Sequence, residues 1–171
     1  IPARNKDEAL QDFDMKNAHP CILLNLMKKH FKENKCKYLE EYVKNRSKYI
    51  SDETTKKDYL TSMNSNKTIK KNSQFFMKLD KEFKTIQKLF WNEYENKVKL
   101  DDVIIAHKNK LKQNKEGKFL NVILTIRENE ILNKVAKKYE DKVETIIFDG
   151  LHLKCDENNI SIIKEMNEIT K

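Results

Sequence analysis

The scarcity of glycine and proline most constrains how this chain folds. Its 171 residues include two glycines and two prolines, so little of the chain is available for tight turns. Apolar residues instead recur at helical spacing in several segments. The sequence therefore predicts long helices joined by few short connections.

An apolar hairpin near the C-terminal end is the main exception to this helical pattern. Residues 143–148 and 151–155 have the composition of β-strands, and Asp149-Gly150 stands between them. Asp-Gly between apolar runs is the strongest short-range signal for a β-hairpin. The sequence therefore predicts two antiparallel strands with an aspartate at their tip.

A third strand is predicted near the N-terminus, at residues 10–15. Its residues alternate, with Phe13 and Met15 on one face and Asp12 and Asp14 on the other. Because the hairpin needs a partner strand, we expect this segment to pair with it. The predicted fold class is α+β, a small antiparallel sheet of about three strands with helices packed on one face.

Helix starts are marked by capping residues and by a proline. Pro20 suits the first turn of a helix, and serine and aspartate are good N-caps. Helices are predicted from Pro20, from about Lys37, after Ser51 or Asp52, after Ser73, over residues 119–139, and over a final segment that carries Ile160, Ile163, Met166 and Ile169.

The helix over residues 119–139 is apolar on more than one face, which predicts burial. Its middle reads "RENE", and charges in a buried helix need partners or a cleft. The polar stretch before it, "NKLKQNKEGK", is predicted to be a helix tail and an exposed loop that turns at Gly117. The whole chain, residues 1–171, is predicted to be one domain or a piece of a larger protein.

Charge and cysteine content narrow the partners only partly. The net charge is +8 and the pI is about 9.2, which fits either a polyanionic partner or a solvated lysine surface. The three cysteines, Cys21, Cys36 and Cys155, have no zinc-ligand spacing. We expect free thiols in a reducing intracellular compartment. No apolar run is long enough to span a membrane, and no signal peptide is recognised.

Two aspartates would meet if the predicted strands pair. Asp14 and Asp149 would then lie at one edge of the sheet, and two carboxylates about 4 Å apart repel by roughly 4 kcal/mol at an effective dielectric near 20. A pair of divalent ions bridged by carboxylates offsets such repulsion and serves phosphoryl or nucleotidyl transfer. The alternative is that Asp149 is only a turn residue and Asp14 only an exposed strand end.

The segment "DFDMKNAHPCILL" (residues 12–24) resembles motif A in the palm of family A-like DNA polymerases. The similarity is to the divergent branch found in viruses, virophages and mobile elements, often fused to primase–helicase proteins. Four further segments resemble that branch in the same order. They are "YLEEYVKNRSKYI", "TTKKDYLTSMNSN" (motif B), "NKEGKFLNVILTIRENEIL" and "TIIFDGLHL" (motif C).

The resemblance implies two metal-binding aspartates. Asp14 matches the motif A aspartate and Asp149 the motif C aspartate, and Mg²⁺ or Mn²⁺ would be the cofactor. Asp12 would be a nearby additional carboxylate. Glu128 and Asn129 would lie under the catalytic edge, which would explain polar residues in an otherwise apolar helix.

The resemblance also implies nucleotide-binding residues. Arg46 and Lys57, with Lys56 as the alternative, would contact the incoming triphosphate or the template backbone. The other interpretation of both lysines is a solvated helix face. His19 would shape the turn from strand to helix or touch the nucleotide sugar.

Three features depart from the family pattern. Motif B ends in "NSN" rather than Asn-Gly-Gly, and Ser65 and Asn66 would crowd a base pair that approaches the backbone. Phe148 replaces the histidine that precedes the motif C aspartate in ordinary family A enzymes, and Gly150 replaces the following acid. No thumb or exonuclease segment is recognised.

The implied function is DNA-templated nucleotidyl transfer by a polymerase-like palm domain. Its partners would be template–primer DNA, deoxynucleoside triphosphates and an associated primase or helicase domain. The alternative is a catalytically inactive polymerase-like domain that binds DNA or partner domains in a viral or mobile-element replication protein. A third hypothesis is a basic, all-helical interaction module, which would lack the sheet.

Overall fold

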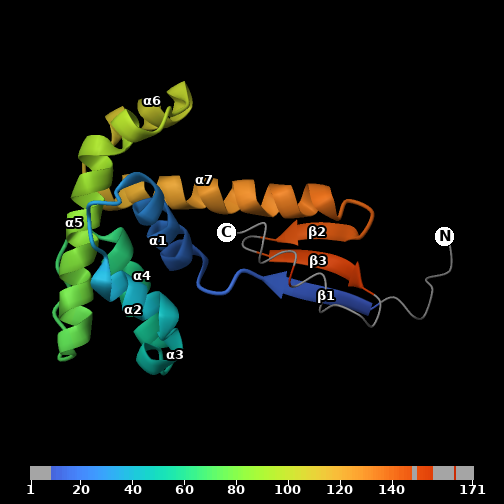
Figure 1. Cartoon of the computed structure of the whole chain (residues 1–171), viewed down its shortest axis with the longest axis horizontal. Helices are drawn as coiled ribbons and strands as arrows, with labels where there is room; N and C mark the ends of the chain where they lie inside the picture. The colour runs from blue at the N-terminus through green and yellow to red at the C-terminus, as the bar shows by residue number, and fades with distance from the viewer. Residues whose placement is uncertain (1–8, 148–149, 156–163, 165–171) are drawn as a thin grey trace. The chain divides into compact units, whose positions relative to one another are not determined.

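The computed structural model describes residues 9–147, 150–155 and 164, and the chain forms two compact units (Figure 1). The sheet unit comprises Ile1–His19 and Ile126–Lys171, and the helical unit comprises Pro20–Thr125. The fold is mostly helical with a three-stranded antiparallel sheet, which confirms the predicted α+β class. The single domain over residues 1–171 stays a prediction.

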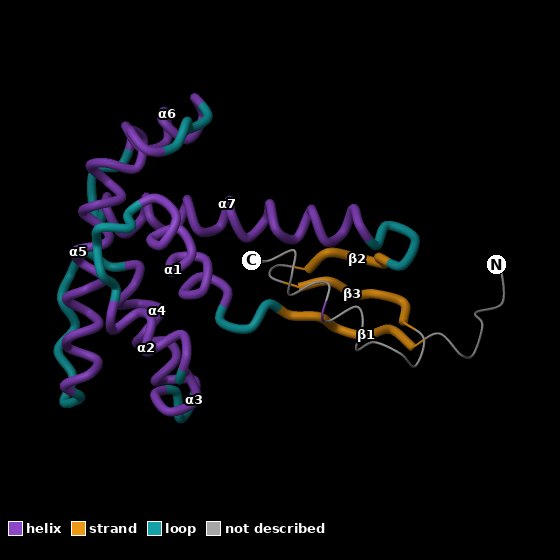
Figure 2. Tube along the Cα trace, in the orientation of Figure 1, coloured by secondary structure: helices purple, strands orange, loops and turns teal. Residues whose placement is uncertain are grey.

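The sheet has the strand order β1-β3-β2, with β3 in the centre (Figure 2). It is built from β1 (Ala9–Asp14), β2 (Val143–Ile147) and β3 (Gly150–Cys155). β3 is antiparallel to both neighbours. The N-terminal strand therefore pairs with the C-terminal hairpin, as the alternating pattern predicts, and the all-helical hypothesis is excluded.

Gly150 is a strand residue, so its predicted place in the turn is wrong. It lies opposite Asp14 on one side and Ile147 on the other, and it does not have a positive φ. Asp-Gly turns depend on a left-handed glycine, whereas ladder pairing on both sides keeps Gly150 extended. Residues 148–149, between the two strands, lie outside the described part of the chain.

The core of the sheet unit lies between one face of the sheet and the second part of α7 (Lys115–Lys138). Leu132 and Val135 of this helix are buried against two leucines of β3, Leu151 and Leu153. Phe13 packs against the same cluster, as does Met15 just beyond the strand. The predicted alternation of β1 is therefore confirmed, because its apolar residues face the helix and its aspartates face the other way.

The helical unit contains nearly all of the helical residues outside the second part of α7. Asp52 accepts a hydrogen bond from the Thr55 N–H at 2.7 Å, so it, and not Ser51, is the N-cap of its helix. Ser73 accepts one from the Phe76 N–H at 3.3 Å, which confirms this predicted N-cap. The helices are α1 (Ala18–His30), α2 (Lys37–Lys44), α3 (Arg46–Tyr49), α4 (Glu53–Asn64), α5 (Gln74–Lys97), α6 (Asp102–Lys110) and the first part of α7.

The core of the helical unit is built around α5. The predicted apolar stripe of this helix is buried at Leu79, Phe83, Ile86 and Phe90, residues that recur every three or four positions. Neither α3 nor α6 was predicted as a separate helix. The predicted final helix carrying Ile160 lies outside the described residues, apart from Lys164.

Gly117 lies in the first turn of α7, so the predicted exposed turn at this glycine is wrong. Its N–H donates to the Asn66 side chain at 2.7 Å, which satisfies a helix N-terminal donor. Asn114, which has a φ of 50°, donates to the Asn64 carbonyl at 2.9 Å. The "NSN" segment therefore has a structural role, because it holds the end of α4 against the start of α7.

A buried polar cluster joins α4 to α5. Asp80 is 1% exposed and accepts a hydrogen bond from Ser62 at 2.6 Å. The Lys84 ammonium lies 3.0 Å from the same carboxylate and donates to the Ser62 carbonyl at 2.6 Å. Gln87 donates to the Met63 carbonyl at 2.6 Å. Side chains of α5 thus satisfy the last carbonyls of α4.

Candidate active site

Asp14 ends β1 on the face of the sheet opposite the apolar core. Its neighbour Phe13 enters the core, so the strand alternation directs Asp14 away from it. The residue is exposed, and its partner across the ladder is Gly150. The structure therefore brings Asp14 against the residue that follows Asp149 in sequence. Asp149 itself lies outside the described residues.

The absence of a side chain at Gly150 makes room for the Asp14 carboxylate. A Cβ built at Gly150 would collide with Asp14 Oδ1 and would lie 3.0 Å from the Phe13 carbonyl oxygen. Any larger residue at this position would therefore require the Asp14 carboxylate to move from where it lies. Gly150 thus lies where the Asp14 carboxylate approaches the central strand.

Asp12 lies on the same face as Asp14 but has a partner. Its Oδ1 lies 3.3 Å from Nε2 of His152, the residue opposite it in the ladder. Among the described residues, none forms an ion pair or a hydrogen bond with the Asp14 carboxylate. The two aspartates are therefore not equivalent, and Asp14 is the one whose oxygens face no described cation.

The turn that follows Asp14 depends on Asn17, a residue that the sequence interpretation did not select. Asn17 has a φ of 61°, a left-handed conformation that asparagine tolerates better than most residues. Its Nδ2 is buried and has no hydrogen-bond partner in the described part of the chain. The sequence signal was the asparagine before Ala-His-Pro, in the segment that resembles motif A.

His19 and Glu128 form a pair that joins the turn after Asp14 to α7. His19 Nε2 lies 3.3 Å from Glu128 Oε2, and both side chains are largely buried. This contact gives the glutamate of "RENE" the partner that its place in an apolar helix requires. It also fits the expectation that His19 shapes the turn. Asn129 is exposed, and its role at the catalytic edge stays a prediction.

The predicted nucleotide-binding residues Arg46, Lys56 and Lys57 all belong to the helical unit. Lys56 is partly buried and lies 3.4 Å from Glu53, whereas Lys57 is exposed. Burial raises the pKa of Tyr42, and the neighbouring Arg46 guanidinium partly offsets this. The expectation that Arg46 and either Lys57 or Lys56 contact a nucleotide bound near Asp14 stays a prediction.

Metal binding at this site requires more than Asp14. Carboxylate oxygens are ligands that Mg²⁺ and Mn²⁺ prefer, and an exposed carboxylate with no described cation beside it fits such an ion. Within residues 9–147 and 150–155, however, no group of three or more histidine, cysteine, aspartate or glutamate side chains is gathered to hold a metal. The site would therefore need Asp149 as its second carboxylate.

No family model, curated protein or solved structure matches this chain. In the described part of the chain, none of the helices is long and apolar enough to cross a membrane.

Proposed function

We propose that this chain is a polymerase-like palm domain that catalyses DNA-templated nucleotidyl transfer. Asp14 and Asp149 would hold Mg²⁺ or Mn²⁺, and the substrates would be a template–primer DNA and deoxynucleoside triphosphates. The observation that carries the proposal is the antiparallel pairing of β1 with β3, which sets Asp14 opposite Gly150. Two sequence segments that resemble motifs A and C therefore meet at one end of two adjacent strands.

The proposed chemistry assigns a separate task to each group of residues. Bound divalent ions would activate the primer hydroxyl and neutralise charge on the phosphates. Asp14 supplies carboxylate oxygens from a strand end that is fixed by its ladder pairing. Arg46 and either Lys57 or Lys56 would offset the triphosphate charge as pyrophosphate leaves.

Support around the motif A turn is part of the proposal. The left-handed Asn17 and the His19–Glu128 contact hold the chain between β1 and α1. Residues that bind metals work best when their surroundings fix their orientation. We infer that Asn17, His19 and Glu128 are positioning residues for Asp14.

Primer extension with Mg²⁺ or Mn²⁺ tests the proposal. Asp14→Asn and Asp149→Asn should each remove detectable extension while thermal stability stays equal or rises, because each change removes a charge that repels another carboxylate. Asp12→Asn is the matched control, since Asp12 lies on the same strand face but pairs with His152. It should retain most of the activity.

Two outcomes would contradict the catalytic assignment. The first is extension that survives in the Asp14→Asn or Asp149→Asn variant. The second is a wild-type chain that binds template–primer but extends it with neither metal, which would favour the inactive, DNA-binding alternative.

A further inference from the structure

Three half-buried aromatic rings lie together in the helical unit, and the proposed chemistry uses none of them. They are Tyr38 of α2, Tyr49 of α3 and Phe75 of α5. Tyr49 and Phe75 are stacked, with ring centroids 3.8 Å apart and planes 9° from parallel. Tyr38 meets Phe75 edge-on at 6.0 Å. We call these three residues the ring cluster.

Lysine ammonium groups lie over two of these rings. Lys48 Nζ is 5.3 Å from the Tyr49 centroid. Lys37 Nζ and Lys78 Nζ are 5.9 Å and 5.8 Å from the Tyr38 centroid. All three lysines are exposed. The half-buried rings therefore lie next to solvated positive charge.

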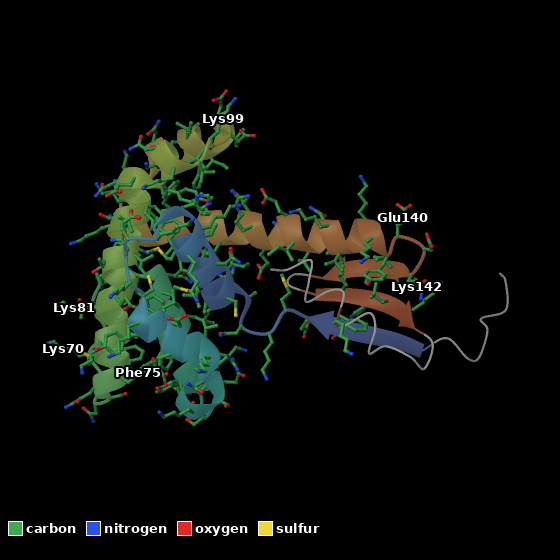
Figure 3. All side chains as sticks on the ribbon, in the orientation of Figure 1. Lys70, Phe75, Lys81, Lys99, Glu140 and Lys142 are labelled. Carbon is green, nitrogen blue, oxygen red and sulfur yellow. The ribbon has the colours of Figure 1, made fainter. Side chains whose placement is uncertain are left out.

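The surrounding segment adds charge of one sign. Residues 66–81 contain five lysines and a single acidic residue, Asp80, which is buried against Lys84. The next acid, Glu82, is also turned inward, where it accepts hydrogen bonds from the N–H groups of Tyr38 and Leu39. Figure 3 shows two of the five lysines, Lys70 and Lys81, at the same end of α5 as Phe75.

One acidic side chain does lie beside the ring cluster. Glu41 accepts a hydrogen bond from the Tyr49 hydroxyl at 2.8 Å, and this bond is the main cause of its lowered pKa. The same carboxylate is 3.9 Å from Lys48. Glu41 thus holds the hydroxyl edge of the Tyr49 ring. Among the described residues, no acidic side chain forms an ion pair with Lys37 or Lys78.

We propose that the ring cluster and its three lysines bind single-stranded nucleic acid. Bases have π-faces that stack on aromatic side chains, and lysines contact the phosphates between them. An acidic protein or a lipid surface would contact the lysines but would not need the half-buried rings beside them. The choice of polymer rests on the proposed function, in which an unpaired template strand must be held. The binding itself needs neither metal nor nucleotide.

Fluorescence anisotropy with a labelled oligothymidine of about 12 nucleotides, in EDTA, tests the lysine part of the proposal. The triple change Lys37→Gln, Lys48→Gln and Lys78→Gln should weaken binding by about tenfold or more at low salt. It should also flatten the slope of log K against log salt by about 2, as expected for three lost phosphate contacts on a single strand.

The matched control removes the same charge elsewhere, by changing Lys134, Lys137 and Lys142 of the sheet unit to glutamine. All three are exposed, and the control should weaken binding by no more than about twofold. Equal losses in the two triple variants would overturn the proposal, because the binding would then follow net charge rather than this surface.

The ring part of the proposal is tested at Tyr49. Tyr49→Leu should weaken oligothymidine binding at least about fivefold, because one stacked base is lost, whereas Tyr49→Phe should bind like the wild type. Should circular dichroism show that Tyr49→Leu unfolds, Tyr38→Leu provides the same test. Native affinity in a folded leucine variant, or heparin binding that is reduced as much as oligothymidine binding, would overturn the stacking role.

A control at Asp14 separates this inference from the proposed function. Asp14→Asn should bind the oligonucleotide as tightly as the wild type. A chain that fails to extend primers but shows the predicted losses at the ring cluster would refute the catalytic proposal and keep this one.

Discussion

Two acidic side chains that are hydrogen-bonded within the helical unit contrast with two exposed aspartates of the sheet unit. In the helical unit, Asp80 is buried with Ser62 and Lys84, and Glu82 caps the first backbone N–H groups of α2. In the sheet unit, Asp12 and Asp14 stand on the solvent-facing side of β1. A carboxylate that is hydrogen-bonded inside the protein helps to hold the fold, whereas an exposed carboxylate without such partners is available to a ligand.

The two glycines repeat this contrast. A Cβ at Gly117 would collide with the backbone carbonyl of Asn64. It would therefore push the start of α7 away from the end of α4. At Gly150 the first obstacle is the end of the Asp14 side chain, which can rotate away. The helical unit therefore uses its glycine for packing, whereas the sheet unit uses its glycine to admit a carboxylate.

Removing the cation of the buried pair should give the largest loss of stability. Lys84→Met leaves Asp80 buried with no positive charge beside it, which typically costs about 3–5 kcal/mol. The free energy of unfolding from urea titration measures the effect. Lys88→Met, an exposed position on the same helix, should change stability by no more than about 0.5 kcal/mol. Similar losses of unfolding free energy in both variants would show that the Asp80–Lys84 pair does not stabilise the helical unit.

Replacing either glycine by alanine should have an effect of intermediate size. The change at Gly117 should mainly lower stability, and the change at Gly150 should mainly lower primer extension. Gly117→Ala forces backbone apart and should destabilise the fold by about 1–3 kcal/mol. Gly150→Ala should cost less, because the Asp14 side chain can move, yet it should reduce primer extension by displacing that carboxylate. Urea titration and extension assays on both variants test this. A Gly150→Ala variant with full activity would show that Asp14 need not approach the central strand.

The smallest expected effect is the pH dependence that Glu82 contributes. Burial raises its pKa above 4.5, although hydrogen bonds from Leu39 and Tyr38 oppose the shift. The folded state therefore binds this proton more tightly than the unfolded chain does. The resulting stability is fully present below the unfolded pKa and is lost as the pH rises through the folded value.

Glu82→Gln should remove this contribution. The wild type should then lose stability relative to the variant as the pH rises from about 4 toward neutrality. Urea titrations of both proteins across this range measure the difference. If the unfolding free energies of the two proteins changed in parallel with pH, the Glu82 carboxyl would have the same pKa in the folded and unfolded states.

The sequence by itself determined the features that depend on near neighbours. Ser73 was recognisable as an N-cap, and the pair Ser51 and Asp52 as the place of another, because a capping bond joins residues three positions apart. The alternation around Phe13 and the apolar runs of the hairpin predicted the strands for the same reason. The prediction that these strands pair followed from the need of any sheet for partners, and the β1–β3 ladder confirms it.

Only the tertiary structure decided which polar residues are internal. Strand alternation placed Asp14 away from the apolar face, but nothing local showed that Asp80 is buried, because its burial depends on the packing of α4 against α5. The helical place of Gly117 depends on Asn66, and the partner of Glu128 is His19, both far away in the chain. Side-chain contacts between distant segments are set by packing of whole elements, which local spacing does not encode. For that reason the sequence pointed to the aspartates, while the fold decided that Asp14 remains exposed beside Gly150.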